Sequence, residues 1–270
     1  MSRNHVPTIP QGVEIRLAHS GPELEAANRL VYQNYVQDGF WEPDEKQLET
    51  NRYLHSVQRV AWVAVRHGEV LGTLSIIHDS PNGLPSDTAQ PELMRDLRAK
   101  GETLAEVSCL ATQRSRAAPQ IVLWLMAWGL QYCLYHEGLG CLVASCKPQH
   151  ANFYESVLCF SKLSPPVYYE YSHAVGYLIS LRLAEAHARL AARYPADAQS
   201  GKSLYRFLLV DPHPALHFPA APALGRDSMI AAAARSDRSA PAAPAAPLRS
   251  ARGAGSGAAP LAGSPQNYVI

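Results

Sequence analysis

A single carboxylate, Glu106, stands in a strand pattern that is otherwise apolar. Residues 104–111 read LAEVSCLA, an alternation typical of a β-strand, with Glu106 and Ser108 on the same face. An unpaired charge in a buried strand is costly, so Glu106 needs either a partner or a chemical task. An ordinary ion pair, with Arg29 or another cation, is the structural alternative.

A short basic loop follows this strand. Thr112 to Pro119 contains Arg114 and Arg116 and leads into an apolar helix that the pattern predicts from about Gln120. Guanidinium groups beside a helix N-terminus suit a phosphate or an acidic surface. A solvated charged turn is the alternative interpretation of these two arginines.

Strands and helices alternate around this stretch, which predicts a mixed α/β sheet with crossover connections. The clearest hairpin is Val60 to Arg66 with Val70 to His78, joined by His67-Gly68-Glu69. The remaining predicted strands are residues 13–18, 139–146, 167–171 and 175–183, and the remaining helices are 22–37, 91–100, 151–159 and 184–194, with a short final element at 203–210. The strands at 104–111 and 139–146 are predicted to be parallel neighbours.

Composition sets the domain boundaries. The chain has 270 residues, 47% of them hydrophobic, and a formal net charge of +1. We predict a flexible N-terminus at 1–12 and one domain at 13–215, with a helical extension at its C-terminal end. Residues 216–270 are rich in Ala, Pro and Gly and cannot bury enough apolar surface to fold, so we expect a disordered tail.

The same sequence argues against several classes of protein. Near-neutral charge gives no support for nucleic-acid binding. The five cysteines have neither CxxC nor zinc-ligand spacing, so we expect buried thiols in a reducing compartment and no metal site. The N-terminus lacks the apolar region of a signal peptide, and the longest apolar run, 121–130, is too short to span a bilayer. We therefore expect a cytoplasmic protein without transmembrane segments.

Four stretches carry a resemblance to a known family. They are RLVYQNY at 29–35, GTLSIIHDSPNGLPSD at 72–87, LAEVSCLA at 104–111 and KPQHANFYESVLCF at 147–160. In order and separation they resemble the long-chain N-acyl amino acid synthases, which are GNAT-like acyltransferases related to acyl-homoserine-lactone synthases. The similarity extends over about residues 13–183. It implies a GNAT fold, in which two central parallel strands splay.

The resemblance also implies a reaction. A fatty acyl group arrives as a thioester on a phosphopantetheine arm, and the amino group of an amino acid or a small amine attacks it to form an amide. No tightly bound cofactor is needed. Glu106 is the candidate that binds the ammonium and relays its proton, with Ser108 close to the thioester. Tyr154 is the candidate that protonates the departing thiolate, with helix packing as the alternative.

The donor side of the implied site is predicted at Leu110, Arg114, Arg116 and Lys147, where the pantetheine arm would pair with strand backbone. Acetyl-CoA-dependent relatives carry a glycine-containing pyrophosphate loop after this strand, but here the sequence is QRSRAAP. Because those glycines are missing, we prefer an acyl carrier protein to free CoA as the donor.

The acceptor side is predicted at six residues, which are Arg29, Tyr32, Phe40, Trp41, Asp79 and Cys109. Related synthases often read Glu-x-Ser-Arg on the central strand, whereas this chain has Cys109 at the arginine position. Arg29 is a candidate substitute for recognising an acceptor carboxylate, and an acceptor amine without a carboxylate is the alternative. A buried structural thiol is the simpler interpretation of Cys109 than a covalent acyl relay. His150 is expected to be a capping or surface residue.

Three other functions fit parts of this pattern. A CoA-dependent GNAT acyltransferase acting on a small amine is the nearest, and the absent glycine loop argues against it. An acyl-homoserine-lactone synthase would need S-adenosylmethionine as acceptor, which the altered arginine position disfavours. A non-catalytic module that binds acyl thioesters is the third.

Overall fold

The computed structural model describes residues 6–18, 20–39, 42–43, 53, 56, 58–135, 139–169, 174–195 and 202–211. All of them belong to one compact unit, which comprises Met1–Leu216 and Gln266–Ile270. The predicted C-terminal tail lies outside the described residues.

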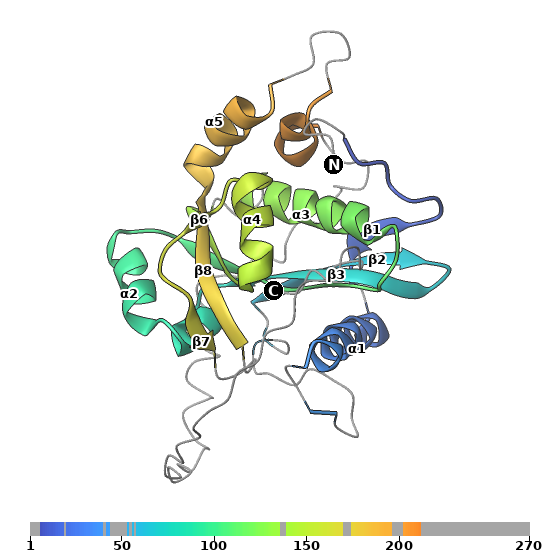
Figure 1. Cartoon of the computed structure of the whole chain (residues 1–270), viewed down its shortest axis with the longest axis horizontal. Coiled ribbons are helices and arrows are strands. Elements are labelled where there is room, and N and C mark those ends of the chain that lie inside the picture. The colour runs from blue at the N-terminus through green and yellow to red at the C-terminus, as the bar shows by residue number, and fades with distance from the viewer. Residues whose placement is uncertain are drawn as a thin grey trace, which may run out of the picture. The chain divides into compact units, whose positions relative to one another are not determined.

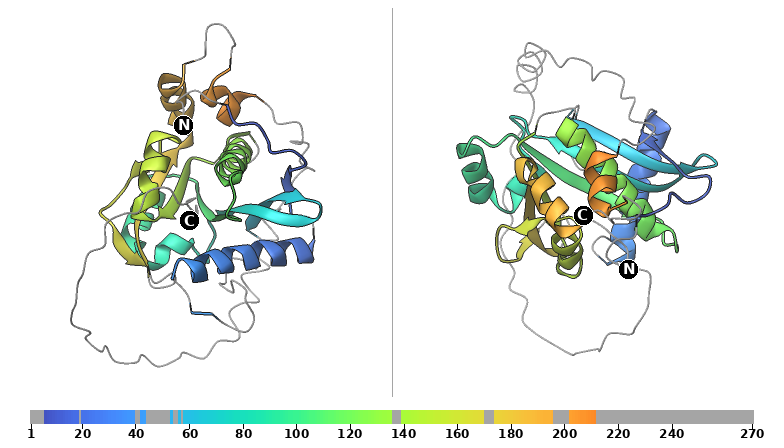
Figure 2. Two further views of the ribbon diagram at one scale, coloured as in Figure 1. Left: turned by 45° about the vertical axis from the view of Figure 1, so that its right-hand side comes forward. Right: turned by 90° about the horizontal axis from the view of Figure 1, so that it is seen from above.

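The described part is a mixed sheet with helices on both faces (Figures 1 and 2). The strands are β1 (Glu14–Leu17), β2 (Arg59–Arg66), β3 (Glu69–His78), β4 (Leu104–Thr112), β5 (Cys141–Cys146), β6 (Ser161–Lys162), β7 (Val167–Tyr169) and β8 (Ala174–Arg182). The helices are α1 (Gly21–Gln37), α2 (Pro91–Ala99), α3 (Ala118–Tyr135), α4 (Pro148–Ser156) and α5 (Leu183–Arg193), with short helical turns η1 (Pro85–Thr88) and η3 (Arg206–Val210).

The strand order is β1-β2-β3-β4-β5-β8-β6, and β7 pairs with β8. All neighbouring strands are antiparallel except β4 and β5, which are parallel as predicted. That parallel pair is joined only at its beginning, where residues 104–106 of β4 oppose residues 141–143 of β5. Both strands continue beyond this point, so they diverge after Glu106 and Val143. The expected splay is therefore present.

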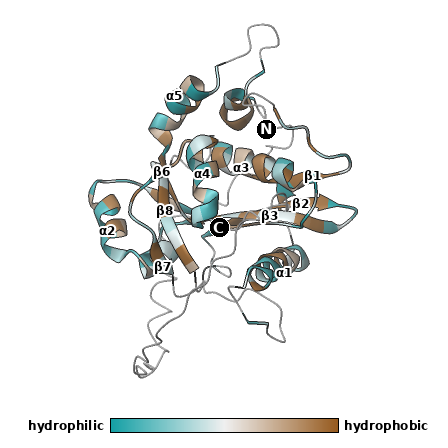
Figure 3. Ribbon diagram, in the orientation of Figure 1, coloured by the Kyte–Doolittle hydropathy of each residue, from teal (hydrophilic) through white to brown (hydrophobic). Residues whose placement is uncertain are grey.

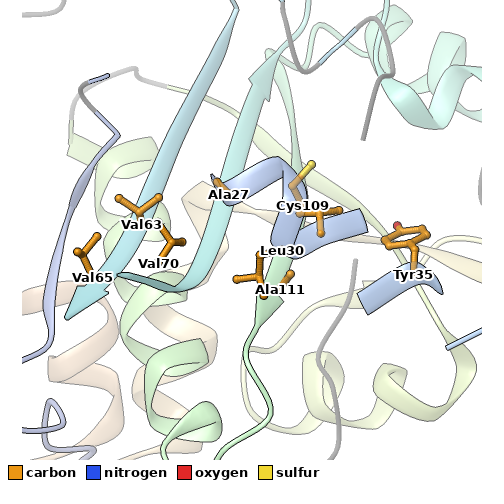
Figure 4. Close-up of a cluster of buried hydrophobic side chains, with 9 residues drawn as sticks. Ala27, Leu30, Tyr35, Val63, Val65, Val70, Cys109 and Ala111 are labelled. Carbon is orange, nitrogen blue, oxygen red and sulfur yellow. The ribbon is translucent and has the colours of Figure 1, made fainter. Parts of the chain in front are cut away.

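Helix α1 covers one face of the sheet and α3 covers the other (Figure 1). The α1 helix begins at an N-cap, Ser20, whose hydroxyl accepts a hydrogen bond from the Glu23 amide, and it carries a proline in its first turn. Its apolar side packs on the strands through a buried cluster (Figure 4), whose members are Ala27, Leu30, Val31, Tyr35, Val63, Val65, Val70, Cys109 and Ala111.

Helix α3 is buried along most of its length and is coloured mostly as hydrophobic, whereas α1 has both kinds of surface (Figure 3). It approaches the sheet closely because glycines lie at the contacts. A β-carbon on Gly72 would come within 2.7 Å of the Ile121 Cγ2 atom. Trp62 of β2 packs edge-on against Tyr132 of α3, with ring centroids 5.0 Å apart. Helix α3 therefore packs closely on β2 and β3.

Several boundaries differ from the sequence-based prediction. Helix α4 begins at Pro148 instead of Ala151, because proline is well suited to the first helical turn. Lys147 is its N-cap, and His150 is buried, so the expectation of a capping or surface histidine is wrong. The predicted loop after β3 contains the turn η1, and the short strand β6 was not expected.

Candidate active site

Glu106 lies in the part of β4 that still pairs with β5, and its side chain is 1% exposed. Its partner is Ser86 of η1. The Ser86 amide donates to Glu106 Oε2 at 2.9 Å, and the Ser86 hydroxyl donates to Oε1 at 2.8 Å. The suggested ion pair with Arg29 is wrong, because Arg29 pairs with Glu25 one helical turn earlier and is 40% exposed. Glu106 is therefore a buried carboxyl group held by neutral donors.

The segment that brings Ser86 to Glu106 is fixed by Arg98 of α2. The Arg98 guanidinium binds both oxygens of Asp79, at 2.6 and 2.9 Å, and both oxygens of Asp87, at 2.6 Å each. Asp87 also accepts a hydrogen bond from the Leu84 amide at 2.7 Å. Residues 79–87 are thus anchored at both ends by one side chain, which sets the position of Ser86. Asp79, expected at the acceptor side, is a member of this network.

The pKa of Glu106 is raised to about 8, and burial is the main cause. The negative charges of Asp87 and Asp79 contribute to this rise, while the two hydrogen bonds from Ser86 oppose it. Near neutral pH the carboxyl group is therefore mostly protonated until a cation approaches it. A ligand ammonium would favour the carboxylate form, since an opposite charge close by lowers an acid's pKa.

A chain of buried hydroxyl groups leads away from Glu106. The Ser86 and Ser145 hydroxyls lie 2.9 Å apart, and Ser145 stands on β5 just beyond the paired residues. Burial raises the pKa of Tyr169, and hydrogen bonds with Ser145 and Gln90 oppose that rise. Polar side chains from η1, β5 and β7 thus meet beside Glu106. They can accept or return a proton without bringing in bulk water.

The backbone of β4 bends just past Glu106. The pairing with β3 changes register between Thr73 and Ser75, and Cys109 has a positive φ of 54°. This is the geometry of a β-bulge, which bends a strand and redirects its side chains. Ser108 and Cys109 lie at the bend, with Ser108 Oγ 3.5 Å from Cys109 Sγ. The Cys109 side chain packs in the α1 cluster, consistent with a buried thiol.

Two of the three basic residues predicted on the donor side, Lys147 and Arg114, converge on one carboxylate. Asp38, directly after α1, accepts from Lys147 Nζ at 2.6 Å and from Arg114 Nη2 at 3.3 Å. Burial lowers the pKa of Lys147, and Asp38 opposes this effect. Lys147 follows β5 and Arg114 follows β4, so Asp38 connects the far ends of the two diverging strands. Arg116 is exposed, whereas Leu110 is fully buried.

The aromatic candidates differ in their surroundings. Tyr32 is buried in α1, and Phe40 and Trp41 lie outside the described residues. Tyr154 of α4 is 1% exposed and contacts its neighbour Phe153 and also Phe160 edge-on, with centroids 5.2 and 5.9 Å away. The packing role proposed as an alternative for Tyr154 is thus present, and its part in proton transfer stays a prediction.

Sequence reasoning missed Ser86, Arg98 and Ser145. One signal existed for Arg98, since it lies four residues after the buried Met94 on the inner side of α2, whereas Arg95 points outward. Nothing in the sequence near Ser86 or Ser145 distinguishes them from other serines, because their role arises from contacts between distant segments.

Comparisons with known proteins agree with this arrangement. A family model described as N-acyl amino acid synthase FeeM matches residues 26–182. The solved structure of FeeM, an N-acyl amino acid synthase from uncultured soil microbes, is 25% identical, covers 67% of this chain and 96% of its own, and superposes with a TM-score of 0.60. The sheet and its flanking helices are thus GNAT-like.

More distant structures also match. A CoA-dependent acyl-homoserine-lactone synthase, BjaI, is 22% identical over 62% of this chain and 81% of its own, with a TM-score of 0.45. The acyl-homoserine-lactone synthase LasI is 15% identical over 64% and 93%, with a TM-score of 0.47. No curated protein sequence matches the chain. Within the described residues, no helix has both the length and the apolar character needed to cross a membrane.

Proposed function

The chain belongs to the N-acyl amino acid synthase family and is an N-acyltransferase, and we propose that it moves a long-chain fatty acyl group from an acyl carrier protein to the amino group of an amino acid. The observation that carries the proposal is Glu106. It is a buried carboxyl group with a pKa of about 8, and it stands where β4 and β5 begin to diverge. Such a group is suited to taking a proton from an amine.

The diverging strands supply the donor side of this proposal. Beyond Glu106 and Val143 the facing edges of β4 and β5 are not paired with each other in the described structure. An extended pantetheine arm can hydrogen-bond to such strand edges. Its phosphate would be drawn to Arg114 and Lys147, in competition with Asp38. Arg116 remains exposed for contact with an acidic carrier protein.

The chemistry then follows from the charges. The acceptor enters as an ammonium ion, and Glu106 releases its own proton to solvent as this cation approaches. The ammonium ion then gives one proton to the resulting carboxylate. The neutral nitrogen bonds to the thioester carbonyl carbon, and the carbon–sulfur bond breaks. The departing sulfur gains a proton, with Tyr154 as the proposed donor. The second proton of the nitrogen restores the Tyr154 phenol, and Glu106 releases the first proton to solvent when the next ammonium ion approaches. Because burial raises the pKa of Glu106 toward that of an amine, the first transfer costs less than it would with an ordinary carboxylate.

The test supplies purified protein with palmitoyl-loaded carrier protein and a mixture of the twenty amino acids, and detects N-acyl products by mass spectrometry. A parallel reaction with palmitoyl-CoA separates the two donors. We expect product with the carrier protein, and a rate lower by roughly 10²–10⁴ in the Glu106→Gln variant. Folded protein that makes no N-acyl amino acid with either donor would overturn the proposal, and a preference for CoA would overturn the choice of donor.

The exposed arginine offers a narrower test of the carrier protein. Arg116→Gln removes a charge that has no role in the fold described above, so the melting temperature should not change. We expect KM for the loaded carrier protein to rise while KM for palmitoyl-CoA rises less. The exposed Arg66→Gln, on the hairpin, serves as the matched control. Equal effects of the two substitutions would argue against docking at Arg116.

A further inference from the structure

Glu106 has to pass a proton to solvent in every turnover of the proposed reaction, although the residue is only 1% exposed. The ammonium group of an amino acid carries three protons. The amide product keeps one of them and the departing thiol gains the equivalent of another, so one proton has to leave the protein each time. In the proposed reaction this proton is the one held by Glu106. The chemistry therefore requires a route by which a buried carboxyl group loses its proton.

Two serine hydroxyl groups follow this carboxyl group in series. The Ser86 hydroxyl lies 2.8 Å from Glu106 Oε1, and the Ser145 hydroxyl lies 2.9 Å from the Ser86 hydroxyl. Ser86 is fully buried, whereas Ser145 is 8% exposed and stands two residues beyond Val143, the last residue of β5 that pairs with β4. The two hydroxyl groups thus lead from the interior of the sheet toward the point at which its central strands separate.

Polar side chains continue past Ser145 toward the surface. Tyr169 of β7 interacts through its phenol with Ser145 and with Gln90. Gln90 lies just before α2, and its Nε2 atom donates to Ser164 Oγ at 2.8 Å. Both Gln90 and Ser164 are half-buried, so this outer end of the network is in contact with solvent. Polar contacts therefore run from the buried carboxyl group to partly exposed side chains.

We infer that Ser86 and Ser145 form a proton path from Glu106 to solvent, and that the rate of proton release depends on Ser145. The inference rests on the proposed function and adds to it a route for the proton. A hydroxyl group can accept one hydrogen bond while it donates another, and a row of such groups can therefore transfer a proton without an intervening charged side chain. Proton transfer of this kind needs hydrogen-bond distances at each step, which both serine contacts have.

The transfer balances in protons and charge. The Glu106 proton passes to the Ser86 oxygen as the Ser86 proton passes to the Ser145 oxygen, and Ser145 gives its own proton outward to solvent. Each serine keeps one proton and stays neutral, while the carboxyl group becomes a carboxylate. At the end both hydroxyl groups donate toward Glu106, which is the direction of the observed hydrogen bond from Ser86.

The other groups near Glu106 are less suited to carry this proton. The Ser86 amide also donates to the carboxyl group, but a backbone amide keeps its proton. Asp79 and Asp87 are close enough to influence the pKa of Glu106, and both are engaged by the Arg98 guanidinium. Among the hydrogen bonds described for Glu106, the one with the Ser86 hydroxyl is therefore the one that leads outward.

The first experiment measures turnover in Ser145→Ala. This substitution interrupts the path and leaves both hydrogen bonds between Ser86 and Glu106 in place. With loaded carrier protein and an amino acid as substrates, we expect kcat to fall roughly 10- to 100-fold, up to the lower end of what positioned proton transfer contributes, with little change in KM. Because proton release should then limit turnover, the ratio of kcat in H2O to kcat in D2O should rise above the wild-type value.

The second experiment follows the proton itself and needs no substrate. A protonated carboxyl group absorbs infrared light apart from carboxylates, and the band that is missing in Glu106→Gln identifies Glu106. After a rapid jump from pH 6 to pH 9, across its pKa of about 8, this band should disappear. We expect it to disappear at least tenfold more slowly in Ser145→Ala than in wild-type protein, and to the same final extent.

Two variants separate proton transfer from a purely structural role. Ser180→Ala removes a hydroxyl that is buried to a similar degree, 7% exposed, and that belongs to β8 opposite Val143, outside the two-serine path. It should leave kcat, the isotope ratio and the infrared rate unchanged. Ser145→Thr keeps a hydroxyl on a residue suited to a strand and should restore most of both rates.

The outcomes separate this inference from the proposed function. Wild-type protein that forms no N-acyl product overturns the proposed function, and the infrared measurement still decides the path. A Ser145→Ala variant whose carboxyl band disappears at the wild-type rate overturns the path and leaves the N-acyltransferase intact. A lower kcat with an unchanged isotope ratio also overturns it, because Ser145 would then support the structure without carrying a proton.

Discussion

Replacing Glu106 by glutamine removes a titrating proton from the middle of the sheet with little change in shape. The amide oxygen can still accept from the Ser86 amide, and the amide nitrogen can donate to the Ser86 hydroxyl, which in turn can donate to Ser145. The hydrogen bonds of the protonated carboxyl group are thus reproduced. We therefore expect Glu106→Gln to fold and to differ from wild-type protein mainly in how its stability depends on pH.

The size of that difference follows from the pKa. Folding raises the pKa of Glu106 from 4.5 to about 8, so the folded state holds this proton more tightly than the unfolded chain does. The resulting stabilisation is fully present below pH 4.5 and is lost as the pH rises through 8. Over about 3.5 pH units, at about 1.36 kcal/mol each, it amounts to roughly 5 kcal/mol.

Thermal unfolding from pH 5 to pH 9 measures this effect. For a domain of this size 1 kcal/mol moves the melting temperature by about 2–4 °C. Over that range, wild-type protein should therefore lose roughly 8–15 °C more than Glu106→Gln does. Glu92→Gln, the same substitution at a side chain 87% exposed, is the control and should follow wild-type protein. A difference between wild type and Glu106→Gln that stays constant from pH 5 to pH 9 would refute the reasoning about burial.

Three further substitutions test the surrounding structure. Arg98→Gln releases Asp79 and Asp87, so we expect a loss of about 1–3 kcal/mol in stability and a lower kcat, whereas the exposed Arg95→Gln on the same helix should change neither. Gly83→Ala introduces a β-carbon 2.7 Å from Asp87 Oδ2 at a φ of 72°, so it should lower the free energy of unfolding by more than about 1–2 kcal/mol. Gly68→Ala has a similarly positive φ but open space around the new β-carbon. It should lose only the free energy of the left-handed backbone conformation and keep full activity. Tyr154→Phe preserves the ring contacts with Phe160, so a kcat lowered at least tenfold with unchanged KM would support proton donation by the phenol, and an unchanged kcat would leave packing as its role.

Local patterns in the sequence predict much of the fold. Alternation placed Glu106 on a buried strand, and the hairpin and the parallel pairing of β4 with β5 were both expected. These features depend on residues close together in the chain or on general rules of connection. The start of α4 was misplaced because the turn-like sequence at Lys147-Pro148 also serves as a helix start.

The contacts that build the site could not be predicted in the same way. Ser86 lies in a stretch whose proline, asparagine and glycine indicated only a turn, and it meets Glu106 because Arg98 fixes that stretch from a later helix. Ser145 reads as an ordinary serine in an apolar strand. Its contact with Ser86 depends on how β5 pairs with β4, and one residue of slippage would turn it to the other face.

Helix α1 is tied to the rest of the fold at two separate places. Asn28, near its middle, accepts a hydrogen bond from Arg59 at the start of β2, and Asp38, just past its end, accepts from Lys147 and Arg114, which follow β5 and β4. An anion that displaced Asp38 from those two cations would release the end of the helix from the diverging strands and leave its middle attached. Thermodynamic linkage then requires that any ligand that alters the packing of that end alter the affinity for the anion, and be altered by it, by an equal factor.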